Sequence, residues 1–303
     1  MRLAILLLPL AALASLAACE QAVTPVEPAA QLSPVAANAI ALEDERRVLD
    51  LEGGVNFRDL GGYRTADGRV TKWEVLYRAG SPAGLTAKDQ AELTRRGIRT
   101  VCDFRTTEER AAEPNPFAQG NSAVTYWTRD YANAMGDLGA VLTGPDASAE
   151  KSRAALIAGY RTMPFEHAES LRAMFGYLAQ GQVPLAFNCS AGKDRTGIAA
   201  ALVLSLLGVP RETVVADYAL SDDIVDYRAQ MEESAAKNPG YGFLTQLPWE
   251  VVEPLLASDP AYIEAALDAI AAKHGSLDAF IEGELGVTPA MKAAIVESLT
   301  EQA

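Results

Sequence analysis

The sequence is poor in the side chains that build disulfide frameworks and metal sites. Its 303 residues include three cysteines, Cys19, Cys102 and Cys189, which lie far apart along the chain. The only two histidines, His167 and His274, do not have the spacing of paired metal ligands. So few cysteines exclude a multi-bridge disulfide fold, and we expect neither a metal ion nor an organic cofactor.

Basic residues are also scarce. Lys and Arg number 26 against 40 Asp and Glu, which gives a formal net charge of −14 at pH 7. Nucleic acids and anionic lipid surfaces attract proteins with an excess of positive charge, so neither is expected as a partner. A substrate with many negative charges would meet a repulsive overall field, which only local positive charge overcomes.

An apolar run at the start of the chain has the features of an export signal. Leu3 to Ala14 follows a positive Met1-Arg2 start and is short for a membrane span. The next segment, Leu16-Ala17-Ala18-Cys19, resembles the cleavage box of bacterial lipoproteins. That resemblance implies a signal peptide over residues 1–18 and a lipid anchor on Cys19. An ordinary signal peptide is the alternative, and both imply export, to the periplasm or outer membrane of the cell envelope or out of the cell.

Composition divides the remaining chain into two parts. Residues 19–44 are rich in Ala, Pro, Val and Gln and contain few aromatics, which predicts a flexible tether. Residues 45–303 are long enough to form one domain with a sizeable core. Because no apolar run long enough to span a membrane follows, we expect contact with a membrane only through the N-terminal lipid anchor.

The stretch from Val183 to Gly208 dominates the chemistry of this domain. Val183 to Asn188 is short and mostly apolar, which is typical of a buried strand. Thr196 to Leu207 is a long apolar run of good helix formers that ends at a glycine. The intervening Cys189-Ser190-Ala191-Gly192-Lys193-Asp194-Arg195 therefore forms a loop between a strand and the N-terminus of a helix.

This loop combines three features that favour an anion. Unpaired N–H groups and partial positive charge at a helix N-terminus stabilise anions, including the thiolate of Cys189. A loop of small residues turns successive backbone N–H groups inward. The planar guanidinium of Arg195 can hold two phosphate oxygens at once. The pattern predicts nucleophilic attack by a thiolate on a phosphate monoester.

The same loop resembles the signature of the cysteine-dependent protein tyrosine phosphatases. Its full form, CSAGKDRTG, is similar to that of bacterial tyrosine and dual-specificity phosphatases that also accept phosphoinositides. Other segments resemble further signatures of this family; they are NFRDLGGY at 56–63, LYRAG at 76–80, DFRTTEE at 103–109 and ADYALSDD at 216–223. The resemblance implies an α/β fold with a mostly parallel central sheet flanked by helices, and with helical insertions.

The resemblance also implies a mechanism and a substrate. Cys189 attacks phosphorus to form a cysteinyl-phosphate, which water then hydrolyses, and Arg195 holds the phosphate together with the loop. The phosphate-binding residues implied are Ser190, Ala191, Gly192, Lys193, Thr196 and Gly197. Thr196 is expected to hydrogen-bond the sulfur, and Lys193 to supply positive charge at the mouth. The implied substrate is a phosphoprotein, with phosphotyrosine first, or a phospholipid.

Two points about the acid and the support of the site stay open. A general acid must protonate the leaving oxygen; the resemblance implies Asp194 within the loop, and Asp103 is the alternative. Asp103 and Arg105 follow a predicted strand, where they could line or brace the active site. Asn188 departs from the family, which usually has histidine before the cysteine. Asparagine donates hydrogen bonds but carries no charge, so weaker activation of the thiol is expected.

Three functional hypotheses follow. The first is an active phosphatase on phosphotyrosine, with phosphoserine, phosphothreonine and phosphoinositides as further substrates. The second is a non-catalytic phosphate-binding pseudophosphatase, which Asn188 suggests. The third is a sulfurtransferase like the rhodaneses, which also carry a cysteine loop at a strand end. The ending Arg195-Thr196-Gly197 argues against the third hypothesis.

Overall fold

The structure is a computed structural model that describes residues 33–132, 138–237 and 242–303. The predicted signal peptide, residues 1–18, and the predicted lipid anchor, Cys19, lie outside these ranges. No helix among the described residues is both long enough and apolar enough to cross a membrane.

A five-stranded sheet forms the centre of the described domain. Its spatial order is β1-β3-β6-β4-β5, and only β1 runs antiparallel to its neighbour. The strands are β1 Arg58–Asp59, β3 Leu76–Ala79, β4 Thr100–Asp103, β5 Thr125–Thr128 and β6 Leu185–Asn188. A separate two-stranded sheet pairs β2 Arg69–Thr71 with β7 Thr300–Gln302. The mostly parallel α/β sheet predicted from the sequence is therefore confirmed.

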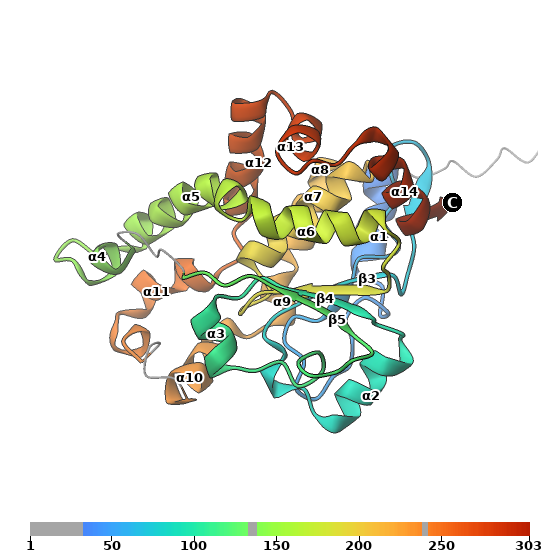
Figure 1. Ribbon diagram of the computed structural model, residues 1–303. Helices are drawn as coiled ribbons and strands as arrows, with labels where there is room; N and C mark the ends of the chain where they lie inside the picture. Colours follow the sequence, from blue (N-terminus) through green and yellow to red (C-terminus); the bar gives the residue numbers. More distant parts are fainter. Residues whose placement is uncertain (1–32, 133–137, 238–241) are drawn as a thin grey trace, which may run out of the picture. The chain divides into compact units, whose positions relative to one another are not determined.

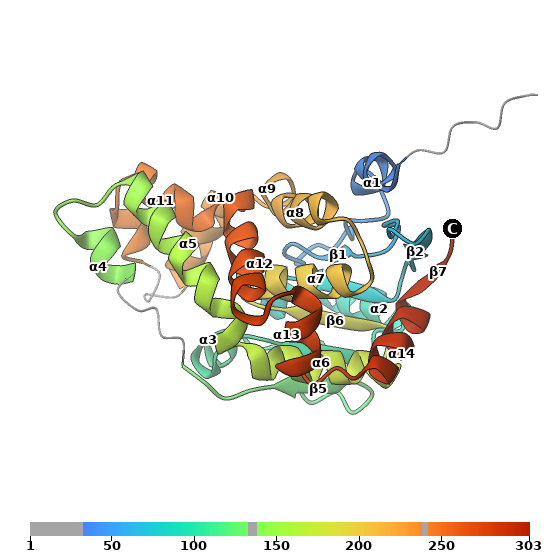
Figure 2. The ribbon, with the colours of Figure 1, turned by 90° about the horizontal axis from the view of Figure 1, so that it is seen from above.

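Helices cover both faces of this sheet, as Figures 1 and 2 show. One face carries α6 Ala168–Ala179, α7 Asp194–Leu206, α8 Arg211–Ala219, α12 Pro260–His274, α13 Leu277–Gly283 and α14 Pro289–Leu299. The other face carries η1 Pro82–Gly84, α2 Ala87–Arg95 and α3 Thr107–Ala112. The helical insertions are α4 Leu138–Thr143, α5 Ala149–Glu166, α9 Ser221–Ile224, α10 Tyr227–Lys237, η2 Leu244–Gln246 and α11 Trp249–Leu256.

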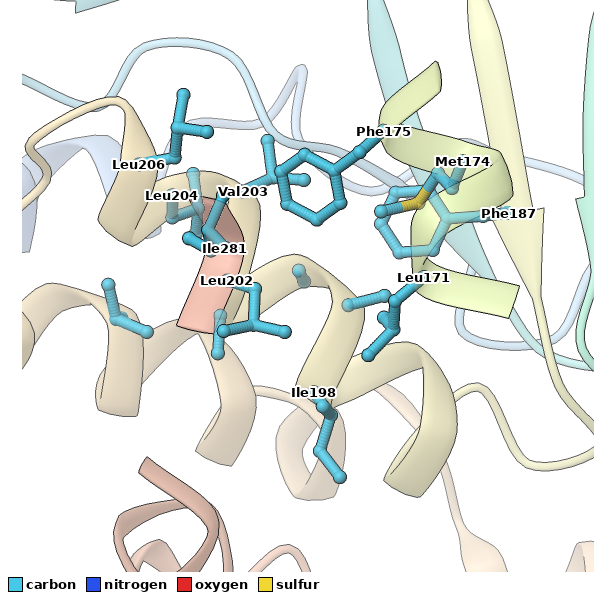
Figure 3. Close-up of a cluster of buried hydrophobic side chains, with 14 of the residues drawn as sticks. Leu171, Met174, Phe175, Phe187, Ile198, Leu202, Val203, Leu204, Leu206 and Ile281 are labelled. Carbon is cyan, nitrogen blue, oxygen red and sulfur yellow. The ribbon is translucent and has the colours of Figure 1, made fainter. Parts of the chain in front are cut away.

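Two apolar clusters fill the spaces above and below the sheet. Successive strand residues point to opposite faces, so in β6 Leu185 and Phe187 join one cluster and Ala186 joins the other. Helix α7 is buried on nearly every side, with Leu202 and Val203 fully inaccessible. Figure 3 shows side chains of α7 together with Phe187 of β6, Ile281 of α13 and three residues of α6 in one cluster. Because the helix is enclosed all round, the loop at its N-terminus is held on a rigid support.

The structure corrects the last part of the predicted tether, residues 19–44, of which residues 19–32 lie outside the described ranges. Residues 34–42 form helix α1, Pro34–Leu42, with Ser33 as its N-cap and proline at the first position. Asn38 is buried and donates hydrogen bonds to the Arg64 carbonyl at 3.0 Å and to Thr213 Oγ1 at 3.1 Å. The tether prediction is therefore wrong for residues 34–42. It was based on amino-acid composition and overlooked the serine and proline at 33–34, which are typical of a helix start.

Candidate active site

The cysteine loop lies at the carboxyl end of β6, as predicted. Strand β6 ends at Asn188, and α7 begins at Asp194. The side chain of Cys189 is buried, with 1% exposure. At Gly192, φ is +69° and an added Cβ would lie 2.5 Å from the Gly80 nitrogen. Only glycine fits this close approach of two backbones, so the loop is pressed against the end of β3.

Arg195 projects from the first turn of α7 and is clamped by a carboxylate. Its two terminal nitrogens lie 2.7 Å from the two oxygens of Glu109. Nη1 also donates to the carbonyl of Phe104 at 3.1 Å and to the hydroxyl of Tyr131 at 3.0 Å. Among the described residues, the hydrogen bonds of the guanidinium come from Nη1 and Nη2, and none comes from Nε. The Nε and Nη2 edge therefore keeps N–H donors that can hold two oxygens of a phosphate.

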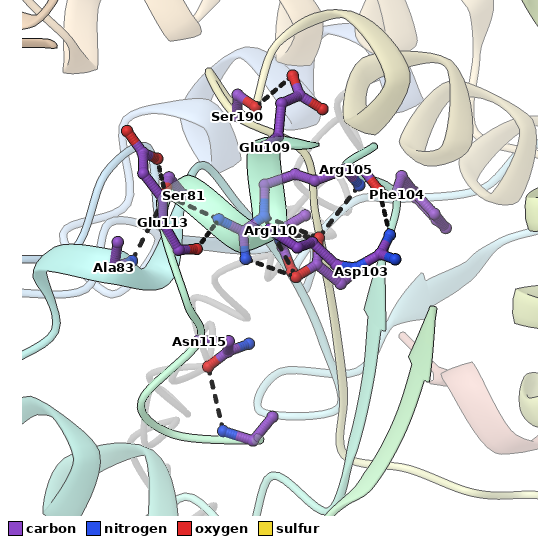
Figure 4. A network of polar contacts seen from close by, with 12 residues as sticks. Ser81, Ala83, Asp103, Phe104, Arg105, Glu109, Arg110, Glu113, Asn115 and Ser190 are labelled. Carbon is purple, nitrogen blue, oxygen red and sulfur yellow. Dashed lines mark hydrogen bonds and ion pairs between the residues drawn. The ribbon is translucent and has the colours of Figure 1, made fainter. Parts of the chain in front are cut away.

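Glu109 holds the loop at two points. Besides the pair with Arg195, its Oε1 accepts a hydrogen bond from Ser190 Oγ at 2.7 Å (Figure 4). Burial alone would raise its pKa, but the hydrogen bonds and charge of Arg195 bring it down to about 2. Glu109 therefore stays ionised and keeps the guanidinium in one orientation.

Sequence reasoning did not single out Glu109, although it belongs to the DFRTTEE segment. Glu109 completes a capping box, because Thr106 Oγ1 accepts from the Glu109 backbone at 3.1 Å and Glu109 Oε2 from the Thr106 backbone at 2.6 Å. This local role explains the residue fully in terms of its own helix. The clamp on Arg195 depends on tertiary contacts that no local pattern contains.

Asp103 and Arg105 form a buried ion pair beside the loop, shown in Figure 4. Both side chains are inaccessible, and Arg105 Nη2 lies 2.7 Å from Asp103 Oδ2. Asp103 Oδ1 also accepts from Asn188 Nδ2 at 3.1 Å, and Oδ2 accepts from the Tyr126 hydroxyl at 2.9 Å. Both oxygens of Asp103 are therefore occupied by protein donors. Arg105 extends the network to the Glu113 carbonyl, at 2.6 Å.

Asp194 has a different environment. It is the first residue of α7, and its side chain is 28% exposed. Oδ1 accepts a hydrogen bond from the hydroxyl of Tyr160 at 2.6 Å, while Oδ2 has no hydrogen bond or ion pair with the described residues. The structure therefore brings Asp194, Arg195 and Cys189 together on one loop and helix end, with one carboxylate oxygen free.

The position of Lys193 differs from the expectation. We expected its ammonium to add positive charge at the mouth of the site. Instead, the side chain has 1% exposure, and Nζ donates to the carbonyls of Leu255 at 2.6 Å and Ala257 at 3.0 Å. Those carbonyls lie at the C-terminal end of α11, where a helix attracts cations. Lys193 therefore ties the loop to α11. Its side chain is long enough to reach these buried carbonyls, whose position cannot be read from the sequence.

The remaining predicted loop residues contact protein groups rather than open space. The hydroxyl of Thr196 donates to the Ala79 carbonyl at 3.4 Å and not to the sulfur. The Ala191 carbonyl accepts from the hydroxyl of Tyr227 at 3.2 Å. At Gly197, an added Cβ would lie 2.7 Å from the ring of Tyr218. Glycine is needed there for the aromatic ring to pack against α7.

A buried polar network beneath the loop joins three of the segments noted in the sequence. Arg78 donates to the Gly192 carbonyl at 2.9 Å and to Asp217 Oδ2 at 2.6 Å. Arg58 Nε lies 3.3 Å from Asp217 Oδ1. Although burial opposes it, the charges of the two arginines lower the pKa of Asp217. One ionised carboxylate between two arginines thus fixes β1, β3 and α8 around the loop.

The described residues contain two free cysteines and no cluster suited to a metal. Cys102 and Cys189 are both buried and unbridged. In the register between β4 and β6, Cys102 pairs with Phe187, two residues before Cys189. That offset separates the Cα atoms by roughly 8 Å, beyond the span of an unstrained disulfide. No group of three His, Cys, Asp or Glu side chains in the described ranges could hold a metal ion.

A family model and three known proteins are similar to this chain. The model of the tyrosine phosphatase family matches residues 49–301. A candidate tyrosine-protein phosphatase of Cupriavidus necator is 35% identical over 77% of this chain and 82% of its own length. The triple specificity protein phosphatase PtpB of Mycobacterium tuberculosis is 30% identical over 80% of this chain and 95% of its own. A tyrosine-protein phosphatase of Nostoc commune is 30% identical over about half of each chain.

The family match and these relatives identify the chain as a phosphatase, an enzyme that hydrolyses phosphoric monoesters. The chain belongs to the tyrosine phosphatase family.

Proposed function

We propose that the protein is a cysteine-dependent phosphatase that hydrolyses phosphotyrosine through a cysteinyl-phosphate intermediate. The observation that carries the proposal is the arrangement of hydrogen bonds around the guanidinium of Arg195. Glu109 and Tyr131 hold one end of its guanidinium, while the edge formed by Nε and Nη2 has donors left for a ligand. A preorganised donor pair beside a thiol at a helix N-terminus suits a transferring phosphoryl group.

The first step breaks the phosphorus–oxygen bond of the ester. The thiolate of Cys189 attacks phosphorus in line and forms a sulfur–phosphorus bond. The loop N–H groups and Arg195 hold the other three oxygens as negative charge redistributes. The leaving oxygen takes a proton from Asp194 and departs as a phenol or alcohol.

The second step restores the enzyme. The Asp194 carboxylate accepts a proton from water, and the water oxygen attacks phosphorus. The sulfur–phosphorus bond breaks, its electron pair returns to Cys189 as thiolate, and inorganic phosphate leaves. Every proton and electron pair is accounted for by the ester, water and these side chains, so no metal ion or organic cofactor is required.

Asp194 is the better candidate for the acid, and Asp103 the better candidate for support. A general acid needs a carboxyl oxygen that can reach the leaving group. Asp103 has both oxygens engaged by Arg105, Tyr126 and Asn188. Asp194 has a free oxygen and a partly exposed side chain.

Substrate range is proposed in order of preference. Phosphotyrosine comes first, because the family and two relatives are named as tyrosine phosphatases. Phosphoserine and phosphothreonine come second, because another relative is named as a triple specificity phosphatase. Phosphoinositides come third, since the Lys193 ammonium expected to receive their additional phosphates is bound to backbone carbonyls.

The test is phosphate release by residues 19–303 with a reducing agent and EDTA present. Wild type is compared with Cys189→Ser, and Cys102→Ser serves as the matched control because Cys102 is an equally buried thiol outside the loop. Loss of release in Cys189→Ser alone supports the proposal. Phosphate binding without release in wild type means a pseudophosphatase, and sulfur transfer from thiosulfate without phosphatase activity means a sulfurtransferase.

We also propose export with a lipid on Cys19, on the basis of the cleavage-box resemblance alone. Expression of the full chain in a bacterium fed labelled palmitate gives the test. Label incorporated by wild type but not by Cys19→Ala supports the anchor. An unlabelled protein secreted in cleaved form supports the ordinary signal peptide, and a protein that keeps its first residues contradicts export.

A further inference from the structure

The free oxygen of Asp194 owes its direction to a tyrosine from a helical insertion. Tyr160 belongs to α5, and its hydroxyl lies 2.6 Å from Asp194 Oδ1. The ammonium of Lys193 lies 3.5 Å from the same oxygen. Both contacts engage Oδ1, which leaves Oδ2 as the oxygen that can exchange a proton with a substrate.

Tyr160 is itself fixed by a second tyrosine. Its hydroxyl lies 2.5 Å from the hydroxyl of Tyr218 in α8. A phenol has one proton to donate. If Tyr160 donates that proton to the Asp194 carboxylate, Tyr218 must donate to Tyr160. The three groups then form a directed chain from Tyr218 through Tyr160 to Asp194, in which each hydrogen bond strengthens the next.

The surroundings of these hydrogen bonds keep the two tyrosine rings from rotating and their hydroxyls from losing protons. Tyr160 is inaccessible, and its ring packs against Tyr218 edge-on and against Tyr262 at 5.4 Å between centroids. Burial raises the pKa of Tyr160 and of Tyr218 well above the usual value. Both hydroxyls therefore stay protonated and keep their role as donors throughout the pH range of the enzyme.

We propose that Tyr160 is a positioning residue for Asp194, whose carboxyl it turns so that Oδ2 meets the leaving oxygen of the substrate. The inference rests on the proposed function, in which Asp194 is the general acid. Tyr160 does not touch the substrate and acts only through the carboxyl. Tyr218 fixes Tyr160, and thus α5 and α8 together set the direction of the proton.

The proposal predicts a dependence on the leaving group. A poor leaving group such as phenol needs its oxygen protonated in the transition state, whereas 2,4-dinitrophenol leaves as an anion without help. If the Asp194 carboxyl is turned away, hydrolysis of phenyl phosphate should therefore become slower, and hydrolysis of 2,4-dinitrophenyl phosphate should change little. A structural defect would slow both esters by the same factor.

The experiment measures kcat/KM for these two esters in full-domain variants. In Tyr160→Phe, kcat/KM is expected to fall about tenfold for phenyl phosphate and less than about threefold for the dinitrophenyl ester. Tyr218 is linked to Asp194 by hydrogen bonds through Tyr160, so Tyr218→Phe should show the same difference between the two esters, but a smaller one. Tyr262→Phe is the matched control, because its hydroxyl donates to the Pro254 carbonyl at 2.8 Å instead. Its ratio between the two esters should equal that of wild type.

Two further variants, Cys189→Ser and Asp194→Asn, show whether the proposed function or only the role of Tyr160 has failed. Activity unaffected by Cys189→Ser would overturn the proposed function and the inference with it. A normal ester ratio in Asp194→Asn would remove the acid that Tyr160 is meant to position. A large ratio change in Asp194→Asn without one in Tyr160→Phe and Tyr218→Phe would overturn the role of Tyr160 alone.

Discussion

One aspartate lies in the cysteine loop and another beside it, and their surroundings differ in every respect that matters for proton transfer. Asp103 is inaccessible, forms an ion pair with Arg105, and has both oxygens occupied. Asp194 is 28% exposed, and a tyrosine holds only one of its oxygens. The comparison teaches that a carboxylate saturated with donors supports a structure, whereas one with a free oxygen is available for chemistry.

The largest expected effect is on catalysis by Asp194. Asp194→Asn keeps the size of the side chain but removes the transferable proton, so kcat for phosphotyrosine should fall about 100-fold or more. Because the side chain is partly exposed, the melting temperature should change little. Steady-state kinetics and a thermal melt measure both quantities. An Asp194→Asn enzyme with nearly normal kcat for phosphotyrosine would reverse the comparison.

The next effect is on stability at Asp103. Asp103→Asn leaves the Arg105 charge buried without its counter-ion, which destabilises a protein by about 3 kcal/mol or more. Urea unfolding should show this loss in the free energy of unfolding. At a temperature where the variant stays folded, we expect kcat within about an order of magnitude of wild type. A stable but inactive variant would instead make Asp103 the acid.

Glu109 extends the comparison to a third carboxylate. Its pKa in the folded protein, about 2, lies below the ordinary value of 4.5. Its contribution to stability is therefore fully present above about pH 4.5 and is lost as the pH falls toward 2, by up to about 3 kcal/mol. Glu109→Gln should flatten the decline of unfolding free energy over this acidic range. An unchanged pH dependence would show that the clamp on Arg195 adds no stability.

Glu109→Gln should also weaken phosphate binding. Without the charged clamp, Arg195 loses its fixed orientation, and inhibition by inorganic phosphate should weaken roughly tenfold. Glu108→Gln is the matched control, because Glu108 is the neighbouring, exposed acid on the same helix. Equal inhibition of both variants would contradict a role for Glu109 in holding Arg195.

The smallest expected effect is at Asn188, although the sequence alone led us to expect weaker activation of the thiol there. Its amide donates to Asp103, and the helix end and Arg195 remain near the thiol whatever residue stands there. Asn188→His should change kcat and the rate of Cys189 alkylation by iodoacetamide less than about fivefold. A gain of orders of magnitude in both would mean that Asn188 leaves the natural thiol poorly activated.

The cysteine loop could be predicted because its determinants are local. An apolar run, small loop residues and a run of helix formers follow one another between 183 and 208. The structure places β6 at Leu185–Asn188 and α7 at Asp194–Leu206. Charged residues at a strand end are likewise visible in sequence, which is why Asp103 and Arg105 were expected beside the site.

Residues that act through tertiary contacts could not be predicted in this way. Tyr160 belongs to a helix with no signature, and only folding brings its hydroxyl to Asp194. The sequence reveals the charge of Lys193 but not the carbonyls at the end of α11 that bind it. Glu109 was hidden for another reason, since a capping box already accounts for an acid at that position.

Trapping the cysteinyl-phosphate would show directly whether the thiolate of Cys189 attacks phosphorus. Asp194→Asn, which lacks the base for hydrolysis, is mixed with 2,4-dinitrophenyl phosphate, quenched in acid and digested for mass spectrometry. The account predicts a phosphoryl group on the peptide that contains Cys189 and on no other. Release of dinitrophenol with no phosphoryl group on Cys189, or with one on another residue, would contradict thiolate attack on phosphorus.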